Sequence, residues 1–161
     1  DGDEVLEPGA ESIIRREIAG CGSATAFNLG IKFLWNSRAQ WRVDGVYGRF
    51  SRPSLFKMIG KYAFRRSGAK GNLHPSCVPA ANFAGRRRSA ASLLHLGYMH
   101  REDRIRKWNF YNTLDPRNIT EGYDERHPER GGYPHIVQGD VPEVPAGIRL
   151  LHAGPLELRP L

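Results

Sequence analysis

The sequence predicts an α/β fold, because stretches with the two-residue period of a strand alternate with stretches that repeat every three to four residues, as helices do. The clearest strand is expected at 26–33, where Phe27, Leu29, Ile31 and Phe33 alternate with polar or small residues. Helical patterns occur both before and after it. The chain has 161 residues, about the length of one domain.

The first expected helix covers residues 8–20. It has a proline in its first turn, three isoleucines on one face and a glycine at its end. After the strand, the polar segment 36–38 predicts a turn, and the apolar residues between Trp41 and Tyr47 predict a partner strand. These elements together predict a hairpin.

A second helix is expected over 53–66, because its apolar residues recur every three to four positions while its lysines fall on the opposite side. The stretch 70–89 is rich in Gly, Pro, Asn and Arg and predicts a loop. It leads into a short apolar strand at 92–96, with His95 near its end.

A third helix is expected over 102–114, which ends before a proline. The remainder, 116–161, is rich in proline and predicts a tail with short extended pieces at 135–138 and 148–152. The expected organisation is therefore a folded part, 1–115, followed by this tail.

The net charge of +7 is unevenly distributed along the chain. Residues 1–30 carry −4, residues 31–107 carry +14, and the rest carry −3. A segment with such an excess of positive charge must meet an anionic partner or remain well solvated.

The composition excludes several classes of protein. A chain with 40% hydrophobic and 25% charged residues is neither disordered nor of low complexity. No run approaches the roughly 20 apolar residues of a membrane span, and the acidic start is not a signal peptide. Two cysteines, Cys21 and Cys77, are too few for a disulfide framework, so a cytoplasmic location is expected.

Because the chain starts at Asp1 without methionine, we expect a fragment of a longer protein.

The first residues, Asp1-Gly2-Asp3-Glu4, are the strongest candidates for a metal site. Asp1 and Asp3 point to the same side of an extended segment and can share a divalent cation, for which Mg²⁺ or Mn²⁺ fits best. His95 at a strand end can add a neutral imidazole nitrogen. The alternatives are a solvated acidic end and a core histidine, and each is the commoner outcome for such a residue alone.

Asp44 lies among many bases and is the candidate general base that takes a proton from an acceptor hydroxyl. The alternative is an ion-pair partner with a lowered pKa. His74, in a loop, is the reserve candidate for the base. Arg86, the first of three consecutive arginines, is a candidate for binding a cofactor phosphate, with a solvated loop as the alternative.

The order of these motifs resembles the family 2 glycosyltransferases, enzymes of the GT-A fold that use nucleotide-sugar donors. Asp1-Gly2-Asp3-Glu4 is similar to the family's DxD-type motif, and the likeness covers roughly residues 1–140. The other segments that carry the resemblance are 41–47, 53–57, 74–79, 94–98 and 104–111.

The resemblance implies a partial GT-A fold, a mixed sheet with flanking helices that lacks the N-terminal nucleotide-binding half. Asp3 would bind the Mn²⁺ or Mg²⁺ that bridges the donor diphosphate, Asp1 would help to hold the nucleotide sugar or the metal, and His95 would be a further contact. Asp44 would be the base of an inverting transfer to a saccharide or another hydroxyl acceptor. The chain alone is expected to be inactive.

Two functions remain open at this point. The preferred one is part of a metal-dependent glycosyltransferase, and the alternative is a basic module that binds RNA or DNA without catalysis. A nucleic-acid binder should lose affinity steeply with salt and ignore manganese, whereas the transferase should bind its donor only with a divalent ion.

Overall fold

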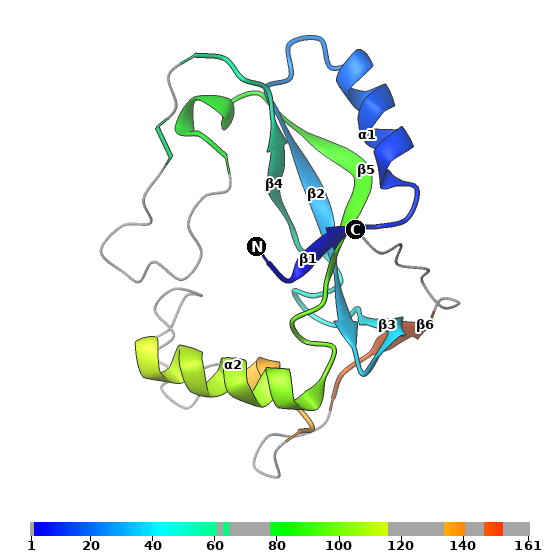
Figure 1. Ribbon diagram of the computed structural model, residues 1–161, viewed down its shortest axis with the longest axis vertical. Helices are drawn as coiled ribbons and strands as arrows, with labels where there is room; N and C mark the ends of the chain where they lie inside the picture. The colour runs from blue at the N-terminus through cyan, green and yellow to red at the C-terminus, as the bar shows by residue number, and fades with distance from the viewer. Residues whose placement is uncertain (1, 61–62, 65–77, 116–133, 141–146, 153–161) are drawn as a thin grey trace.

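The computed structural model describes residues 2–60, 63–64, 78–115, 134–140 and 147–152. Within these residues six strands form one mixed sheet, and two α-helices pack against it (Figure 1). The expected α/β fold is therefore confirmed. No helix among them is long and apolar enough to cross a membrane.

The sheet is built around two long parallel strands, β2 and β5, and every other strand pair is antiparallel. The strand order is β1-β5-β2-β3-β6, and β4 also pairs with β2. The strands are β1 (Glu4–Leu6), β2 (Ala26–Trp35), β3 (Ser37–Arg42), β4 (Ser51–Phe56), β5 (Arg86–His95) and β6 (Leu150–His152). The helices are α1 (Ala10–Ala19) and α2 (Arg101–Leu114), with 3-10 turns η1 (Ala80–Asn82) and η3 (Pro134–Ile136).

The central strand β2 follows from its alternating hydrophobic residues, and it extends the strand predicted at 26–33 by two residues. The hairpin is also confirmed, because Asn36 adopts φ 63°, a left-handed conformation that Asn tolerates, and β3 returns antiparallel to β2. The predicted partner strand from Trp41 to Tyr47 is right only at its start, since β3 ends at Arg42.

The helix predicted over 53–66 is wrong. Residues Ser51–Phe56 form strand β4, which pairs with β2 from Ala26 to Gly30. This pairing overrides the helical spacing, because β propensity depends on tertiary neighbours. Pro53 is tolerated because it lies on a strand with β2 as its one partner in the sheet.

The helices predicted at 8–20 and 102–114 are confirmed as α1 and α2. The strand predicted at 92–96 is the last part of the longer β5, which takes up residues assigned to the loop at 70–89. Residues 65–77 lie outside the described part of the chain.

Two segments beyond residue 115 join the fold. A 3-10 turn, η3, stands where an extended piece was predicted at 135–138, whereas β6 falls within the piece predicted at 148–152. Ile136 and Val137 are fully buried. The segment after α2 therefore contributes to the core.

The core consists of two clusters on the sheet. One lies under α1, beside the upper part of the sheet in Figure 1, and the other lies between the lower end of the sheet and α2. The α1 cluster contains Ala10, Ala24, Phe27, Leu29 and Ala91. The α2 cluster contains Ile31, Phe33, Trp35, Tyr47, Tyr98, Ile136 and Val137. Of the candidate site residues predicted from the sequence, Asp3, His95 and Asp44 lie around the second cluster.

Candidate functional site

The first described residues pair with the end of β5. Glu4 in β1 lies opposite His95, and the amide of Leu96 donates a hydrogen bond of 2.8 Å to the carbonyl of Asp3. This antiparallel pairing brings the acidic start of the chain to the strand end that carries His95.

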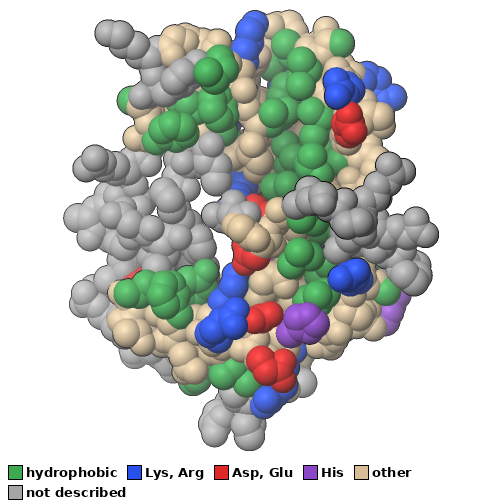
Figure 2. Space-filling model, in the orientation of Figure 1, with side chains coloured by type: hydrophobic (Ala, Val, Ile, Leu, Met, Phe, Trp, Pro, Cys, Tyr) green, Lys and Arg blue, Asp and Glu red, His purple; other side chains and the backbone are tan. Residues whose placement is uncertain are grey.

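Asp3 meets two side chains from distant parts of the sequence. Lys107 Nζ, from α2, donates a hydrogen bond of 2.6 Å to Asp3 Oδ2, and His95 Nε2 lies 3.7 Å from the same oxygen. Acidic and basic side chains adjoin one another over α2 in the lower half of Figure 2. We call Asp3, His95, Gly97 and Lys107 the Asp3 cluster.

Gly97 leaves the space in which these side chains meet. A Cβ atom at this position would lie 2.1 Å from Asp3 Oδ2 and 2.4 Å from Lys107 Nζ. Because such distances are far below van der Waals contact, any larger residue would displace one or both side chains.

His95 is buried among aromatic rings and has an unusual electrostatic environment. Its ring lies 5.1 Å from Phe33 and 4.7 Å from Tyr98, measured between centroids. Burial and the positive charge of Lys107 lower the pKa of His95 to about 4, against an opposing effect of Asp3. At neutral pH the ring is uncharged, as a metal ligand must be. Its Nδ1 atom is buried and has no hydrogen-bond partner among the described residues.

Asp3 remains ionised beside this histidine. Partial burial alone would raise the pKa of the Asp3 carboxyl, but the hydrogen bond from Lys107 and the electrostatic effects of His95 and Lys107 outweigh it and lower the pKa. The cluster therefore offers an ionised carboxylate and a neutral imidazole at neutral pH.

One donor of this pair is of the type that Mn²⁺ or Mg²⁺ prefers. Hard carboxylate oxygen is their preferred ligand, whereas imidazole is more typical of sites for Zn, Cu, Fe or Ni. The 3.7 Å between the two donor atoms can be spanned by one ion with bonds of about 2.1 Å. No group of three or more His, Cys, Asp or Glu side chains in the described part of the chain could hold a metal ion. Asp1, the third predicted ligand, lies outside the described residues.

Asp44 is held in a different environment. Both of its oxygens accept hydrogen bonds from Arg42, at 2.9 and 2.8 Å, and Oδ1 also accepts one of 3.1 Å from the amide of Arg149. Although desolvation would raise the pKa of Asp44, the hydrogen bonds from Arg42 and Arg149 lower it. Asp44 is thus an ion-pair partner, as the alternative interpretation predicted.

Arg42 ties Asp44 into the core and keeps it apart from the Asp3 cluster. Arg42 is 1% exposed and stacks on the rings of Trp35 and Tyr47. Tyr47 in turn contacts Phe33, which also contacts His95. Aromatic side chains therefore lie between Asp44 and His95.

The structure does not bring Arg86 to the Asp3 cluster. Arg86 is the first residue of β5 and His95 is the last, so they are separated by roughly 30 Å along the strand. Arg86 is exposed and lies over the ring of Phe83. His74, the reserve base, lies outside the described residues.

Two members of the Asp3 cluster were not foreseen from the sequence. Lys107 lies in the helix predicted over 102–114, and its side chain is only 20% exposed and faces Asp3. Helical spacing tells which residues share a face, but it does not tell which element that face meets. Gly97 gives no local signal, because its importance arises from close approach in space.

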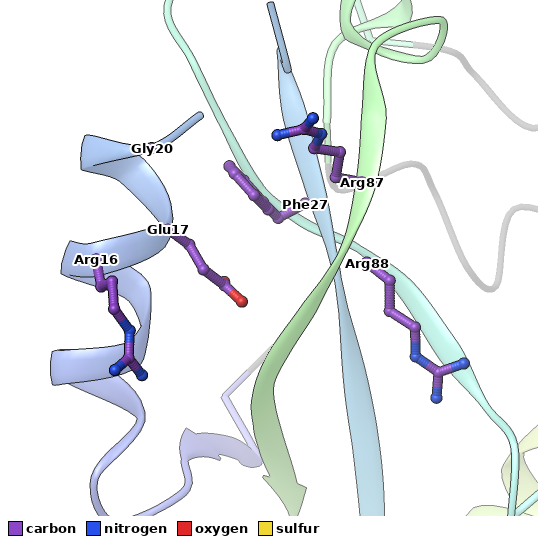
Figure 3. Close-up of a pocket in the computed structure, with 6 residues that line it drawn as sticks. All are labelled: Arg16, Glu17, Gly20, Phe27, Arg87 and Arg88. Carbon is purple, nitrogen blue, oxygen red and sulfur yellow. The ribbon is translucent and has the colours of Figure 1, made fainter. Parts of the chain in front are cut away.

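A cavity of about 440 Å³ lies between α1 and the first halves of β2 and β5 (Figure 3). It is far from His95 along β5. Its one acid, Glu17, points from α1 toward the sheet and accepts hydrogen bonds from Ser89 Oγ and the amide of Ala90. Glu17 therefore serves to attach α1 to the sheet.

No family model, curated protein or solved structure matches this chain.

Proposed function

We propose that this chain is part of a metal-dependent glycosyltransferase with a GT-A-like fold, which transfers a sugar from a nucleotide-sugar donor to an acceptor hydroxyl. The observation that carries this proposal is the meeting of Asp3 with His95 and Lys107 at one end of the sheet. Lys107 is 104 positions away from Asp3 in the sequence. The resemblance to family 2 assigns the same acid and the same histidine to the donor diphosphate.

Asp3 Oδ2 and His95 Nε2 are the atoms that would hold the metal. A divalent cation there would neutralise the charge that develops on the diphosphate as the glycosidic bond breaks. Lys107 adds a fixed positive charge beside Asp3 and keeps its carboxylate oriented. Gly97 leaves room for the side chains of Asp3 and Lys107, since any side chain there would displace them.

The base of an inverting transfer is assigned to Asp44 on sequence grounds. Its lowered pKa keeps it ionised at neutral pH but also makes it a weaker base. Bidentate pairing with Arg42 leaves it little freedom to accept a further proton. We therefore expect substitutions of Asp44 to act on stability at least as much as on turnover.

The proposal is tested by turnover of the full-length protein with a panel of nucleotide sugars and Mn²⁺. We expect Asp3→Asn to lower kcat/KM about 100-fold or more, because it removes the charge that holds the cation. Glu11→Gln, an exposed carboxylate on α1, is the matched control and should leave turnover unchanged. Near-normal turnover of Asp3→Asn would contradict the metal assignment.

The alternative is a basic module that binds nucleic acid, and the exposed Arg86, Arg87 and Arg88 support it. Against it, several bases of the +14 segment are paired with acids rather than available to phosphates. These paired bases are Lys32, Arg42, Arg52, Arg104 and Lys107. Binding of an oligonucleotide that falls steeply with salt and ignores Mn²⁺ would favour the alternative.

A further inference from the structure

The sheet forks along one edge of β2. Residues Ala26–Gly30 pair with β4, whereas Leu34 and Trp35 pair with β3. Between these two pairings the loop 43–50 closes against β2, with a hydrogen bond of 3.0 Å from the amide of Ile31 to the carbonyl of Phe50. A cavity of about 170 Å³ lies at this fork.

The cavity opens on the face of the sheet opposite α1. Phe27, Leu29 and Ala91 pack under α1, so alternation places Gly30, Lys32 and Arg88 on the other face. In Figure 3 the side chains of Arg87 and Arg88 leave β5 in different directions, and Arg88 borders both this cavity and the one beside α1, whereas Arg87 borders only the latter of these two. Lys32 and Arg88 line the cavity together with Arg42 from the end of β3 and Arg49 from the loop.

This lining has an excess of positive charge. It contains four basic side chains and no acid. Two of the four are compensated by acids nearby, Lys32 by Glu7 and Arg42 by Asp44. Arg49 and Arg88 are exposed and have no ion pair with any described residue.

Polar and aromatic groups complete the wall. Ser92 lines the cavity, and its hydroxyl has no hydrogen-bond partner among the described residues. The ring of Trp41 stands beside it with Lys32 Nζ 4.8 Å from its centroid. Two guanidinium groups and a hydroxyl around one hollow are donors of the kind that bind a phosphate group.

We propose that this cavity binds the phosphate group of a small phosphomonoester, such as a phosphorylated sugar. Its volume is below the roughly 300–1,000 Å³ of sites that enclose a whole drug-sized ligand. It therefore suits one tetrahedral anion, with the sugar lying against Trp41 at its rim. Arg49 and Arg88 bind the phosphate oxygens, and Ser92 donates a further hydrogen bond.

The binding needs no metal, since the charge is supplied by the protein. The site therefore stands apart from the Asp3 cluster. Calorimetry of the full-length protein with EDTA present, at low ionic strength, separates the two proposals. Glucose 6-phosphate and inorganic phosphate should bind, whereas glucose should not.

Two variants test which residues bind the phosphate group. Arg49→Gln and Arg88→Gln should each weaken binding of glucose 6-phosphate about tenfold, because each removes charge-assisted hydrogen bonds. Arg87→Gln is the matched control, since Arg87 is adjacent in the same strand but does not border this cavity. It should bind within about twofold of the unmodified protein. Thermal melts of all three variants confirm that the fold is retained.

Several outcomes would overturn the proposal. The phosphate site is excluded if the unmodified protein does not bind glucose 6-phosphate, or if glucose binds equally well. It is also excluded if Arg88→Gln binds like the unmodified protein or if Arg87→Gln loses as much affinity. Asp3→Asn should leave this binding unchanged, so failure of the glycosyltransferase proposal and failure of this one are distinguishable.

Discussion

The Asp3 cluster and the surroundings of Asp44 are built from similar parts. Each places a carboxylate beside a basic side chain that itself lies over an aromatic ring. They differ in how far the carboxylate is satisfied. Asp44 accepts three hydrogen bonds, two from Arg42 and one from the amide of Arg149, whereas the side chain of Asp3 accepts one from Lys107 and faces a neutral imidazole.

This difference indicates which carboxylate has the capacity to bind a ligand. A carboxylate whose acceptor sites are filled by buried donors stabilises the fold and has little capacity left for a ligand. A carboxylate with acceptor sites left over, next to a neutral histidine with a buried and unpartnered Nδ1, can still bind a cation. The contacts of Asp44 therefore stabilise the fold, whereas the ligand role of Asp3 is part of the proposed function.

The largest effect on stability is expected from substitution of Arg42. This side chain also donates hydrogen bonds of 2.5 Å to the carbonyl of His135 and to Gln138 Oε1, and it lies 4.7 Å from the Trp35 ring. Arg42→Met should lower the free energy of unfolding by about 4 kcal/mol, because it removes these hydrogen bonds and the buried charge that pairs with Asp44. Urea denaturation measures the loss.

The control for that variant is Arg38→Met, an exposed position on the same strand. It should change the free energy of unfolding by less than about 0.5 kcal/mol. Equal losses from the two variants would show that the Arg42 contacts do not stabilise the fold.

Two histidines, His95 beside Asp3 and the partly buried His135 beside Arg42, make the fold sensitive to acid. Burial, with the charges of Lys107 and Arg42 respectively, lowers the pKa of His95 and of His135 from 6.5 to about 4. Each is therefore neutral in the folded protein and protonates more readily when unfolded. The stability that they contribute is complete above pH 6.5 and is lost as the pH falls toward 4.

Each histidine should account for about 3 kcal/mol of that loss. His95→Gln and His135→Gln should each flatten the curve of unfolding free energy against pH between 6.5 and 4. Both should also lower the free energy of unfolding at pH 7. Chemical denaturation at a series of pH values measures the slope. An unchanged slope in either variant would show that its histidine is not buried as a neutral ring.

Two glycines give smaller and more selective effects. A Cβ at Gly48 would lie 2.2 Å from the carbonyl oxygen of Val43, which is backbone, so Gly48→Ala should cost about 2 kcal/mol of stability. A Cβ at Gly97 strikes the flexible ends of Asp3 and Lys107 instead. Gly97→Ala should therefore cost less than about 1 kcal/mol but impair the candidate site.

Thermal melts and turnover together test this pair of glycines. We expect Gly48→Ala to melt early with its turnover retained below the melting range, and Gly97→Ala to melt nearly normally with its turnover lowered. The reverse pattern would show that the Asp3 cluster is structural.

Much of the fold could be predicted from local patterns. Both α-helices, the strand β2 and its hairpin follow from periodicity and turn residues. Strand β4 was missed because its pairing with β2 is a long-range contact, which overrides the helical spacing of residues 53–66. The burial of Ile136 and Val137 was missed because prolines around them suggested a tail.

The site was predictable only in part. Asp3 and His95 were proposed as ligands of one ion, and they lie 3.7 Å apart. Their roles as ligands stay predictions. The contact of Lys107 with Asp3 could not be predicted, because the spacing of apolar residues in a helix does not determine how that helix is oriented against the sheet. The Asp44–Arg42 pair was foreseen only as an alternative to catalysis.

The most direct test of the central claim is the affinity of the full-length protein for Mn²⁺, measured by the loss of the electron paramagnetic resonance signal of the free ion. If the Asp3 cluster binds the metal, Asp3→Asn should weaken binding about tenfold or more, whereas folded Asp44→Asn should remain within about twofold. Unchanged affinity in Asp3→Asn, or an equal loss in Asp44→Asn, would contradict the account.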